Sequence, residues 1–135
     1  EPNVDTSKPI TAGDKSFAWK PATGNGPIGL VDMMGALGEV ERVFGYAYAE
    51  VDVGEEGDGQ IRLGSDDGNQ VWLNGKRVFE NRADRGSALD QDKVDVHFVK
   101  GRNTILAKIS QGVGCWNFCL LLAKPDGTVI SFTQP

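Results

Sequence analysis

Residues 61–78 read Ile61-Arg-Leu-Gly-Ser-Asp-Asp-Gly-Asn-Gln-Val-Trp-Leu-Asn-Gly-Lys-Arg-Val78. The stretch predicts short antiparallel strands joined by two tight turns. Asn74-Gly75 is the stronger turn signal, because both central residues of a type I′ hairpin turn need a positive φ. Asp66-Asp67-Gly68 fits a hairpin loop of about three residues with Gly68 in the left-handed conformation.

The two turns together sort the side chains of this stretch between two faces of a sheet. Successive side chains alternate across a strand, so one apolar set must face the core. That set is Ile61, Leu63, Val71, Leu73 and Val78. A row on the opposite face consists of Arg62, Trp72 and Arg77. Such a row is either a tryptophan covered by arginine stems or a stacking platform flanked by hydrogen-bond donors.

Composition bounds the class of protein. The 135 residues suffice for one domain, and the 18 glycines suit many short strands and turns. A formal net charge of −5 argues against a nucleic-acid partner. No apolar run reaches the roughly 18 residues of a membrane span, so we expect no membrane insertion. The chain begins at Glu1 without a signal-peptide pattern, and we expect a domain excised from a multidomain protein.

The rest of the chain alternates short apolar runs with turn residues. Residues 1–15 predict a linker or N-terminal arm, and residues 16–135 predict a single domain. The longest strand candidate, 40–53, places Phe44, Tyr46 and Tyr48 on one face and small residues on the other. Roughly eight or nine strands are expected, with no amphipathic helix of useful length. The fold class predicted is all-β, an antiparallel β-sandwich of the jelly-roll type.

An enzyme is not expected. The single histidine, His97, lies on a predicted strand beside Asp95 and has no serine partner, while most carboxylates occupy glycine-rich turns. No phosphate-binding or zinc-protease motif is present. Cys115 and Cys119 would lie about 13 Å apart in a strand, which is beyond disulfide reach. We therefore expect free cysteines and no catalytic residues.

Calcium is the one metal to consider. Acidic side chains gather at 52–58, 66–67 and 90–92, and hard cations take several loop oxygens, although no EF-hand spacing is present. A structural calcium ion is one interpretation, and ordinary turn geometry is the other.

The charged connection 80–92 is long for a compact domain, and such loops often carry function. Its charges are either solvated surface ion pairs of little energetic value or a polar rim beside an aromatic platform. Sugars are bound by such rims, since their rings stack on aromatic side chains and their hydroxyls hydrogen-bond to arginine and aspartate.

Motifs in a fixed order carry a resemblance. They are Gly64-Ser-Asp-Asp-Gly68, Val71-Trp-Leu-Asn-Gly75-Lys, Asp90-Gln-Asp92, Lys100-Gly-Arg-Asn103-Thr-Ile-Leu and Trp116-Asn-Phe118. Over residues 46–127 the chain resembles β-sandwich domains of the galactose-binding-like superfamily. The resemblance implies a non-catalytic module of a large secreted or extracytoplasmic bacterial protein, many of which degrade polysaccharides.

The Ser-Asp-Asp-Gly turn is also similar to one in adhesin-type domains of the anthrax protective antigen family. In some of those domains adjacent aspartates hold calcium at a sugar site, a role that the resemblance would give to Asp66 and Asp67. The further ligand loops of those domains have no match in this sequence.

Two functions are therefore expected as alternatives. The first is a carbohydrate-binding module that attaches a larger secreted protein to a polysaccharide or oligosaccharide, with an acidic polymer favoured by the arginines. Its expected ligand-binding residues are Trp72, Arg62, Arg77, Arg82, Arg85, Asp92 and, at an alternative edge site, Trp19. The second is a structural spacer or protein-interaction module without a sugar ligand. An exposed Trp72 favours binding, and a covered Trp72 favours the spacer.

Overall fold

The computed structural model describes residues 4–12, 14–38 and 40–135. Within these ranges the fold is all-β, with eleven strands and one short helix. The antiparallel β-sandwich predicted from the sequence is confirmed. The strand count exceeds the expected eight or nine because β1, β2, β3 and β11 are only two or three residues long.

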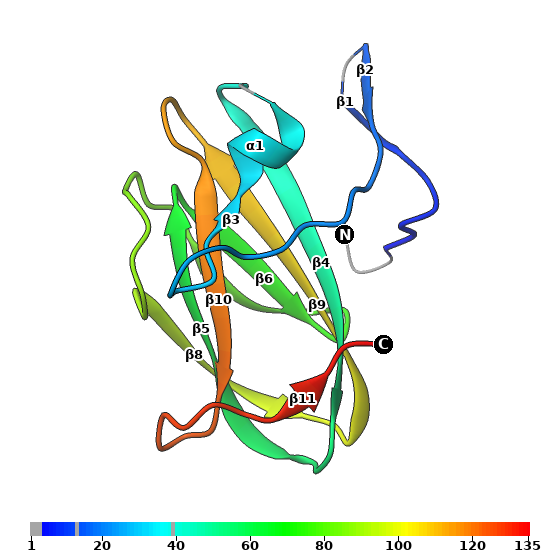
Figure 1. The fold of residues 1–135 in the computed structure, drawn as a ribbon, viewed down its shortest axis with the longest axis vertical. Coiled ribbons are helices and arrows are strands. Elements are labelled where there is room, and N and C mark those ends of the chain that lie inside the picture. The colour runs from blue at the N-terminus through cyan, green and yellow to red at the C-terminus, as the bar shows by residue number, and fades with distance from the viewer. Residues whose placement is uncertain (1–3, 13, 39) are drawn as a thin grey trace.

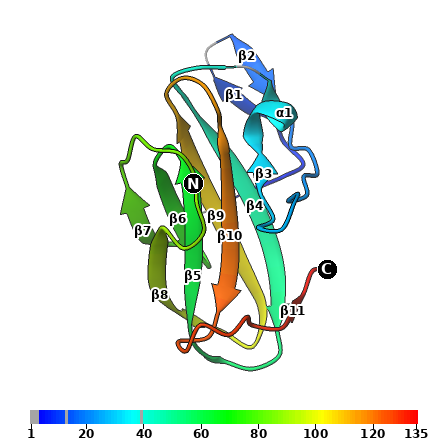
Figure 2. The same ribbon diagram turned by 60° about the vertical axis from the view of Figure 1, so that its left-hand side comes forward.

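Two antiparallel sheets face one another (Figures 1 and 2). The four-stranded sheet has the order β3 (Val31–Asp32), β10 (Asn117–Ala123), β5 (Gly57–Asp66), β8 (Asp92–Phe98). The five-stranded sheet has the order β11 (Phe132–Thr133), β4 (Val43–Val53), β9 (Gly101–Gln111), β6 (Asn69–Leu73), β7 (Lys76–Asn81). Between β3 and β4 the chain forms the short helix α1 (Met33–Leu37).

The N-terminal segment forms a separate hairpin of β1 (Ile10–Ala12) and β2 (Lys15–Phe17). It lies beside the end of the sandwich that carries α1 (Figure 1). The expected boundary between arm and domain, after residue 15, therefore falls inside β2. The one described helix, α1, has five residues, and no described helix is long and apolar enough to cross a membrane.

The Asn74-Gly75 turn is confirmed. Both residues have a positive φ, 52° and 82°, and Trp72 lies opposite Arg77 as expected. A β-bulge then shifts the register, so Val71 lies opposite Phe79 instead of Val78. The Asn74 side chain also holds the turn to the neighbouring strand. Its Oδ1 accepts from the Thr104 N–H at 2.8 Å, and its Nδ2 donates to Asn103 Oδ1 at 2.9 Å.

The prediction of a hairpin at Asp66-Asp67-Gly68 is wrong. β5 and β6 belong to different sheets, so the chain crosses from one sheet to the other at this point. The Asp67 N–H donates to the Ser110 carbonyl, and the Ser110 N–H donates to the Gly68 carbonyl. Gly68 does not adopt a positive φ. It is a glycine because a Cβ there would lie 2.5 Å from a backbone carbonyl oxygen of β7.

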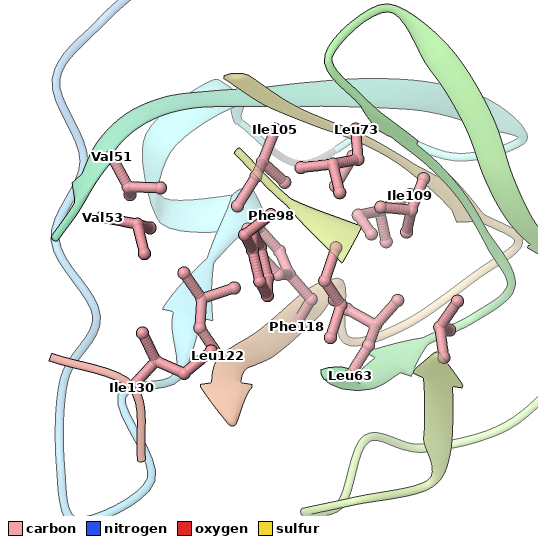
Figure 3. Packing of buried hydrophobic residues seen from close by; sticks show 14 of the residues in the cluster. Val51, Val53, Leu63, Leu73, Phe98, Ile105, Ile109, Phe118, Leu122 and Ile130 are labelled. Atoms are coloured by element: carbon pink, nitrogen blue, oxygen red, sulfur yellow. The ribbon is translucent and has the colours of Figure 1, made fainter. Parts of the chain in front are cut away.

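The predicted core face is confirmed. Ile61, Leu63 and Val71 are fully buried, Leu73 is buried, and Val78 packs against the same cluster while half-buried. β5 and β6 contribute to one core from opposite sheets (Figure 3). Burial of each such side chain contributes about 1.5–3 kcal/mol. The other labelled members are Val51, Val53, Phe98, Ile105, Ile109, Phe118, Leu122 and Ile130.

The small residues of β4 also face this core. A Cβ on Gly45 would lie 2.4 Å from Trp116 Cζ2, so the large indole of Trp116 fits only because Gly45 has no side chain. This packing sends the aromatic residues of β4, Phe44, Tyr46 and Tyr48, to the outer face of the five-stranded sheet.

Candidate binding groove

The expected row of Arg62, Trp72 and Arg77 does not form. Trp72 and Arg77 lie opposite one another on β6 and β7, on the outer face of the five-stranded sheet. Arg62 lies on β5, in the other sheet. The row depended on pairing β5 with β6, and the separation of these strands into two sheets removes it.

Arg62 is engaged on the surface of the four-stranded sheet. Its Nε and Nη2 atoms donate to Gln60 Oε1 at 3.1 and 3.0 Å, and its Nη1 lies 3.3 Å from Asp90 Oδ2. The Arg62 side chain is only 15% exposed. These contacts give Arg62 a structural role in covering its own sheet.

Trp72 belongs to a row on the five-stranded sheet in which Trp72 and Leu106 are covered and Arg77, at the edge, is exposed. Tyr48, Leu106, Trp72 and Arg77 stand side by side across β4, β9, β6 and β7. Trp72 is 7% exposed and Leu106 is 4% exposed, although neither belongs to the core between the sheets. Trp19, which follows β2, packs edge-on against Tyr48, with 6.4 Å between the ring centroids. A buried Trp72 cannot serve as an open stacking platform in this structure.

The neighbouring rows of the same face are less buried. Phe44 is 63% exposed, and strand register places Ser110 opposite it. The next row contains Tyr46, Lys108, Gln70 and Glu80. Lys108 Nζ lies 4.6 Å from the Phe44 ring centroid and 5.4 Å from that of Tyr46. These are cation–π distances, and they hold the ammonium group against the aromatic surface.

A groove of about 490 Å³ lies over these two rows. Its lining is formed by Phe44, Gly68, Asn69, Gln70, Glu80, Asn81, Arg82, Ala83, Asp84, Lys108 and Ser110. A second hollow, of about 330 Å³, shares Ala83, Asp84 and Ser110 with the first. It extends to Arg42, Asp67 and residues 111–113, at the end of the sandwich where β9 turns into β10 (top of Figure 1). We call the two hollows together the Phe44 groove.

Glu80 is a carboxylate of the Phe44 groove that forms ion pairs with two arginines. Its carboxylate lies 2.6 Å from Arg82 Nε and 3.3 Å from Arg77 Nη1. The hydrogen bond from Arg82, followed by one from Gln70, lowers the pKa of Glu80. The Arg82 side chain is 89% exposed. Arg82 is the only one of the seven expected ligand-binding residues that lines the groove, and Arg77 reaches it through Glu80.

Arg85 and Asp92 have a different place. Arg85 Nη2 lies 2.5 Å from Asp92 Oδ2, and the two side chains are only 20% and 6% exposed. Asn69 and Asn81 donate to the same carboxylate at 2.9 and 3.0 Å. Burial alone raises the pKa of Asp92, but the hydrogen bonds from Arg85, Asn69 and Asn81 outweigh it and lower the pKa. This buried network joins the two sheets, and it leaves little of either side chain on the surface.

The long connection after β7 does not form a free rim. Its second half, 86–91, lies on the outer face of the four-stranded sheet. Ser65 N donates to Gln91 Oε1 at 3.0 Å, and the Cys119 Sγ lies 3.8 Å from the Ala88 carbonyl oxygen. A Cβ on Gly64 would fall 1.7 Å from that carbonyl oxygen, so the loop approaches the sheet as closely as a glycine allows.

Asp66 and Asp67 do not form a calcium site in this structure. Both oxygens of the Asp67 carboxylate already accept backbone N–H groups, from Gly112 at 2.8 Å and from Arg85 at 3.1 Å. Burial, followed by the negative charges of Asp67 and Asp84, raises the pKa of Asp66. Across the described ranges, no three acidic, histidine or cysteine side chains are grouped closely enough to hold a metal ion.

The remaining reactive side chains lie elsewhere. Cys115 and Cys119 are free, as expected, with Cys115 exposed and Cys119 buried. His97 is exposed on β8, and its Nδ1 lies 2.9 Å from Asp58 Oδ1 on β5. Its partner is therefore a cross-strand aspartate, and the neighbouring Asp95 instead accepts from Gln60 Nε2 at 3.0 Å.

Sequence reasoning missed Phe44, Lys108 and Asp84 as groove residues. The aromatic face of β4 was visible in the sequence, but the residues opposite it come from β9, some 60 positions later. Local patterns do not give that register.

Comparisons of this chain with family models, with curated proteins and with solved structures find no match.

Proposed function

We propose that this protein is a non-catalytic carbohydrate-binding module that holds a larger secreted or extracytoplasmic protein on a polysaccharide. The supporting observation is the exposed ring of Phe44 at the edge of a groove lined by polar side chains. Sugar rings stack on such aromatic faces, and their hydroxyl groups pair with amides, carboxylates and hydroxyls beside them. A volume of about 490 Å³ lies within the range of small-ligand sites.

Binding without catalysis agrees with the placement of the titratable groups. The single histidine, His97, lies on the four-stranded sheet and does not line the groove. Glu80 is held as a carboxylate by two arginines, so it is a poor proton donor at neutral pH. Neither His97 nor Glu80 therefore serves as a general acid in the Phe44 groove.

The test is calorimetric titration with soluble polysaccharides and oligosaccharides, using wild type and Phe44→Ala. We expect one carbohydrate to bind saturably and Phe44→Ala to weaken it by about tenfold, because the stacking surface is lost. Phe132→Ala is the matched control. Phe132 is also exposed, at 41%, but lies on β11 outside the groove, so its removal should leave the affinity unchanged.

A spacer or protein-interaction module is the second candidate, and the burial of Trp72 favours it. The covered row and the packing of Trp19 on Tyr48 are what an internal structural surface requires. Absence of binding to every carbohydrate tested, or equal binding by Phe44→Ala and wild type, would move the assignment away from the Phe44 groove.

A further inference from the structure

The two hollows of the Phe44 groove adjoin, because Ala83, Asp84 and Ser110 line both of them. The first hollow crosses the sheet from β4 to β7, which is three strand spacings, or about 14 Å at roughly 4.8 Å per spacing. The second leads away along the strands. On β9 the lining runs from Lys108 in the first hollow to Gln111 in the second, a distance of about 10 Å. The groove as a whole is therefore longer than one or two sugar rings.

Each hollow combines an exposed apolar side chain with polar groups. The first has the Phe44 ring beside the Gln70 amide. The second has Val113, which is 62% exposed, and the exposed side chains of Arg42 and Asp84. A guanidinium donates hydrogen bonds and a carboxylate accepts them, so the two together suit hydroxyl groups, which do both. The second hollow thus offers the same kinds of contact to a sugar ring as the first.

The wall of the second hollow is held in place by a buried carboxylate. Asp67 is only 8% exposed, and its two oxygens accept from the Gly112 N–H at 2.8 Å and the Arg85 N–H at 3.1 Å. The Gly112 carbonyl oxygen in turn accepts from the Arg42 N–H at 2.9 Å. These bonds join the start of β4, the connection after β7 and the turn after β9. A wall fixed in advance loses little conformational entropy when a ligand binds.

We infer that the Phe44 groove binds an extended segment of a glycan chain across both hollows, and that Asp67 is a positioning residue for the second hollow. This inference rests on the proposed carbohydrate binding and adds the length of the ligand to it. A disaccharide occupies the first hollow, whereas a longer oligosaccharide also reaches Val113 and Arg42. The affinity should therefore rise with chain length until both hollows are filled.

The test is calorimetric titration of the whole chain with oligosaccharides from the disaccharide to the hexasaccharide. The probes are cello-, manno- and xylo-oligosaccharides and the oligomers of galacturonic acid. Neutral and acidic series are both needed, because cations and carboxylates both line the groove. In the series that binds, the hexasaccharide should bind at least about tenfold more tightly than the disaccharide.

A substitution at Val113 tests the second hollow alone. Val113→Ser removes apolar surface from that hollow, so it should weaken the hexasaccharide by about threefold to fivefold and leave the disaccharide unchanged. Val129→Ser is the matched control, because Val129 is 60% exposed and lies outside both hollows. Both valines are exposed, so neither change disturbs the core. Phe44→Ala, in contrast, should weaken both oligosaccharides.

The positioning role of Asp67 has a distinct signature. Asp67→Asn places an amide donor against one of the two backbone N–H groups, which loosens the wall of the second hollow. We expect the hexasaccharide to bind about fivefold more weakly and the disaccharide to bind as it does to wild type. Equal weakening of the two ligands would show that Asp67 only supports the fold.

The outcomes distinguish the inference from the function on which it rests. Equal affinities of wild type for the disaccharide and the hexasaccharide overturn the inferred length and leave carbohydrate binding in place. Hexasaccharide binding that is weakened in Phe44→Ala but unchanged in Val113→Ser overturns the role of the second hollow. Failure of wild type to bind any carbohydrate overturns the proposed function, and the inference fails with it.

Discussion

The two outer faces of the sandwich differ in how completely they are covered by the rest of the chain. On the four-stranded sheet, the loop 86–91 lies directly on β5 and β10, and Arg62 is tied to Gln60 and Asp90. On the five-stranded sheet, part of the surface is covered around Trp72, while Phe44 and the groove beside it stay open. A covered face contributes to stability, and an open face is available for binding. Substitutions should therefore separate the two faces by their effects.

The largest effect is expected at Trp72. Trp72→Ala should lower the free energy of unfolding by about 3–4 kcal/mol, because a buried indole is lost and leaves a cavity. Phe44→Ala, on the same sheet face, should change it by less than about 0.5 kcal/mol. Urea denaturation of both variants measures the difference. Equal losses would mean that the two rows are not distinct surfaces.

The next effect concerns the buried network that joins the sheets. Asp92→Asn should cost about 2–3 kcal/mol, because it leaves the Arg85 guanidinium poorly paired in a mostly buried place. Glu80→Gln removes the carboxylate from solvent-exposed ion pairs with Arg77 and Arg82, and its loss of stability should be much smaller. Thermal and urea unfolding compare the pair. A larger loss in Glu80→Gln would contradict the assignment of Asp92 as a structural residue.

A smaller loss is expected where the loop meets the four-stranded sheet. Gly64→Ala should cost about 2 kcal/mol, because the added methyl group collides with the Ala88 carbonyl oxygen and displaces the loop. Gly57→Ala, on the same strand, meets no atom within 4 Å and serves as the control. Limited proteolysis of the loop should accelerate only in Gly64→Ala. Equal protection in the two variants would show that the loop tolerates a side chain below it.

The smallest effect depends on pH. The hydrogen bond that the His97 ring donates to the Asp58 carboxylate raises the pKa of His97, so the folded chain binds this proton more tightly than the unfolded chain, in which histidine has a pKa of about 6.5. The resulting stabilisation is fully present below that pH and is lost as the pH rises through the folded-state pKa. The melting temperature of wild type should therefore exceed that of Asp58→Asn by more at pH 6 than at about pH 8. A difference independent of pH would show that His97 does not respond to Asp58.

Local sequence signals predicted the Asn74-Gly75 turn and the core faces of β5 and β6. They failed at Asp66-Asp67-Gly68 for a physical reason. Strands that pair in one sheet and strands that face each other across a sandwich both direct their apolar residues to one core. The alternation of Leu63 and Val71 is therefore the same in both arrangements. Only the backbone partner of Asp67, Ser110 in the other sheet, distinguishes them.

The candidate groove was less predictable than the fold. Its aromatic wall follows from the alternation of side chains along β4, which puts Phe44 on the outer face because Gly45 faces the core. Its polar wall depends on the register between β4, β9 and β6, and long-range register has no local sequence signature. The sequence pattern places Trp72 on the outer face of the sheet, and this placement is the same for an exposed and for a buried residue. Its burial is a property of the neighbours that tertiary structure places around it.

The Asn74-Gly75 turn also makes the chain susceptible to a slow chemical change. An asparagine before glycine is prone to deamidation, because its side-chain carbonyl is attacked by the next backbone nitrogen and glycine does not hinder the approach. In the folded chain both side-chain atoms of Asn74 are held, by Thr104 and by Asn103. Deamidation would replace the amide donor with a carboxylate oxygen facing the Asn103 acceptor. The fraction of aged chains in a stored sample should thus record how long this turn has spent open.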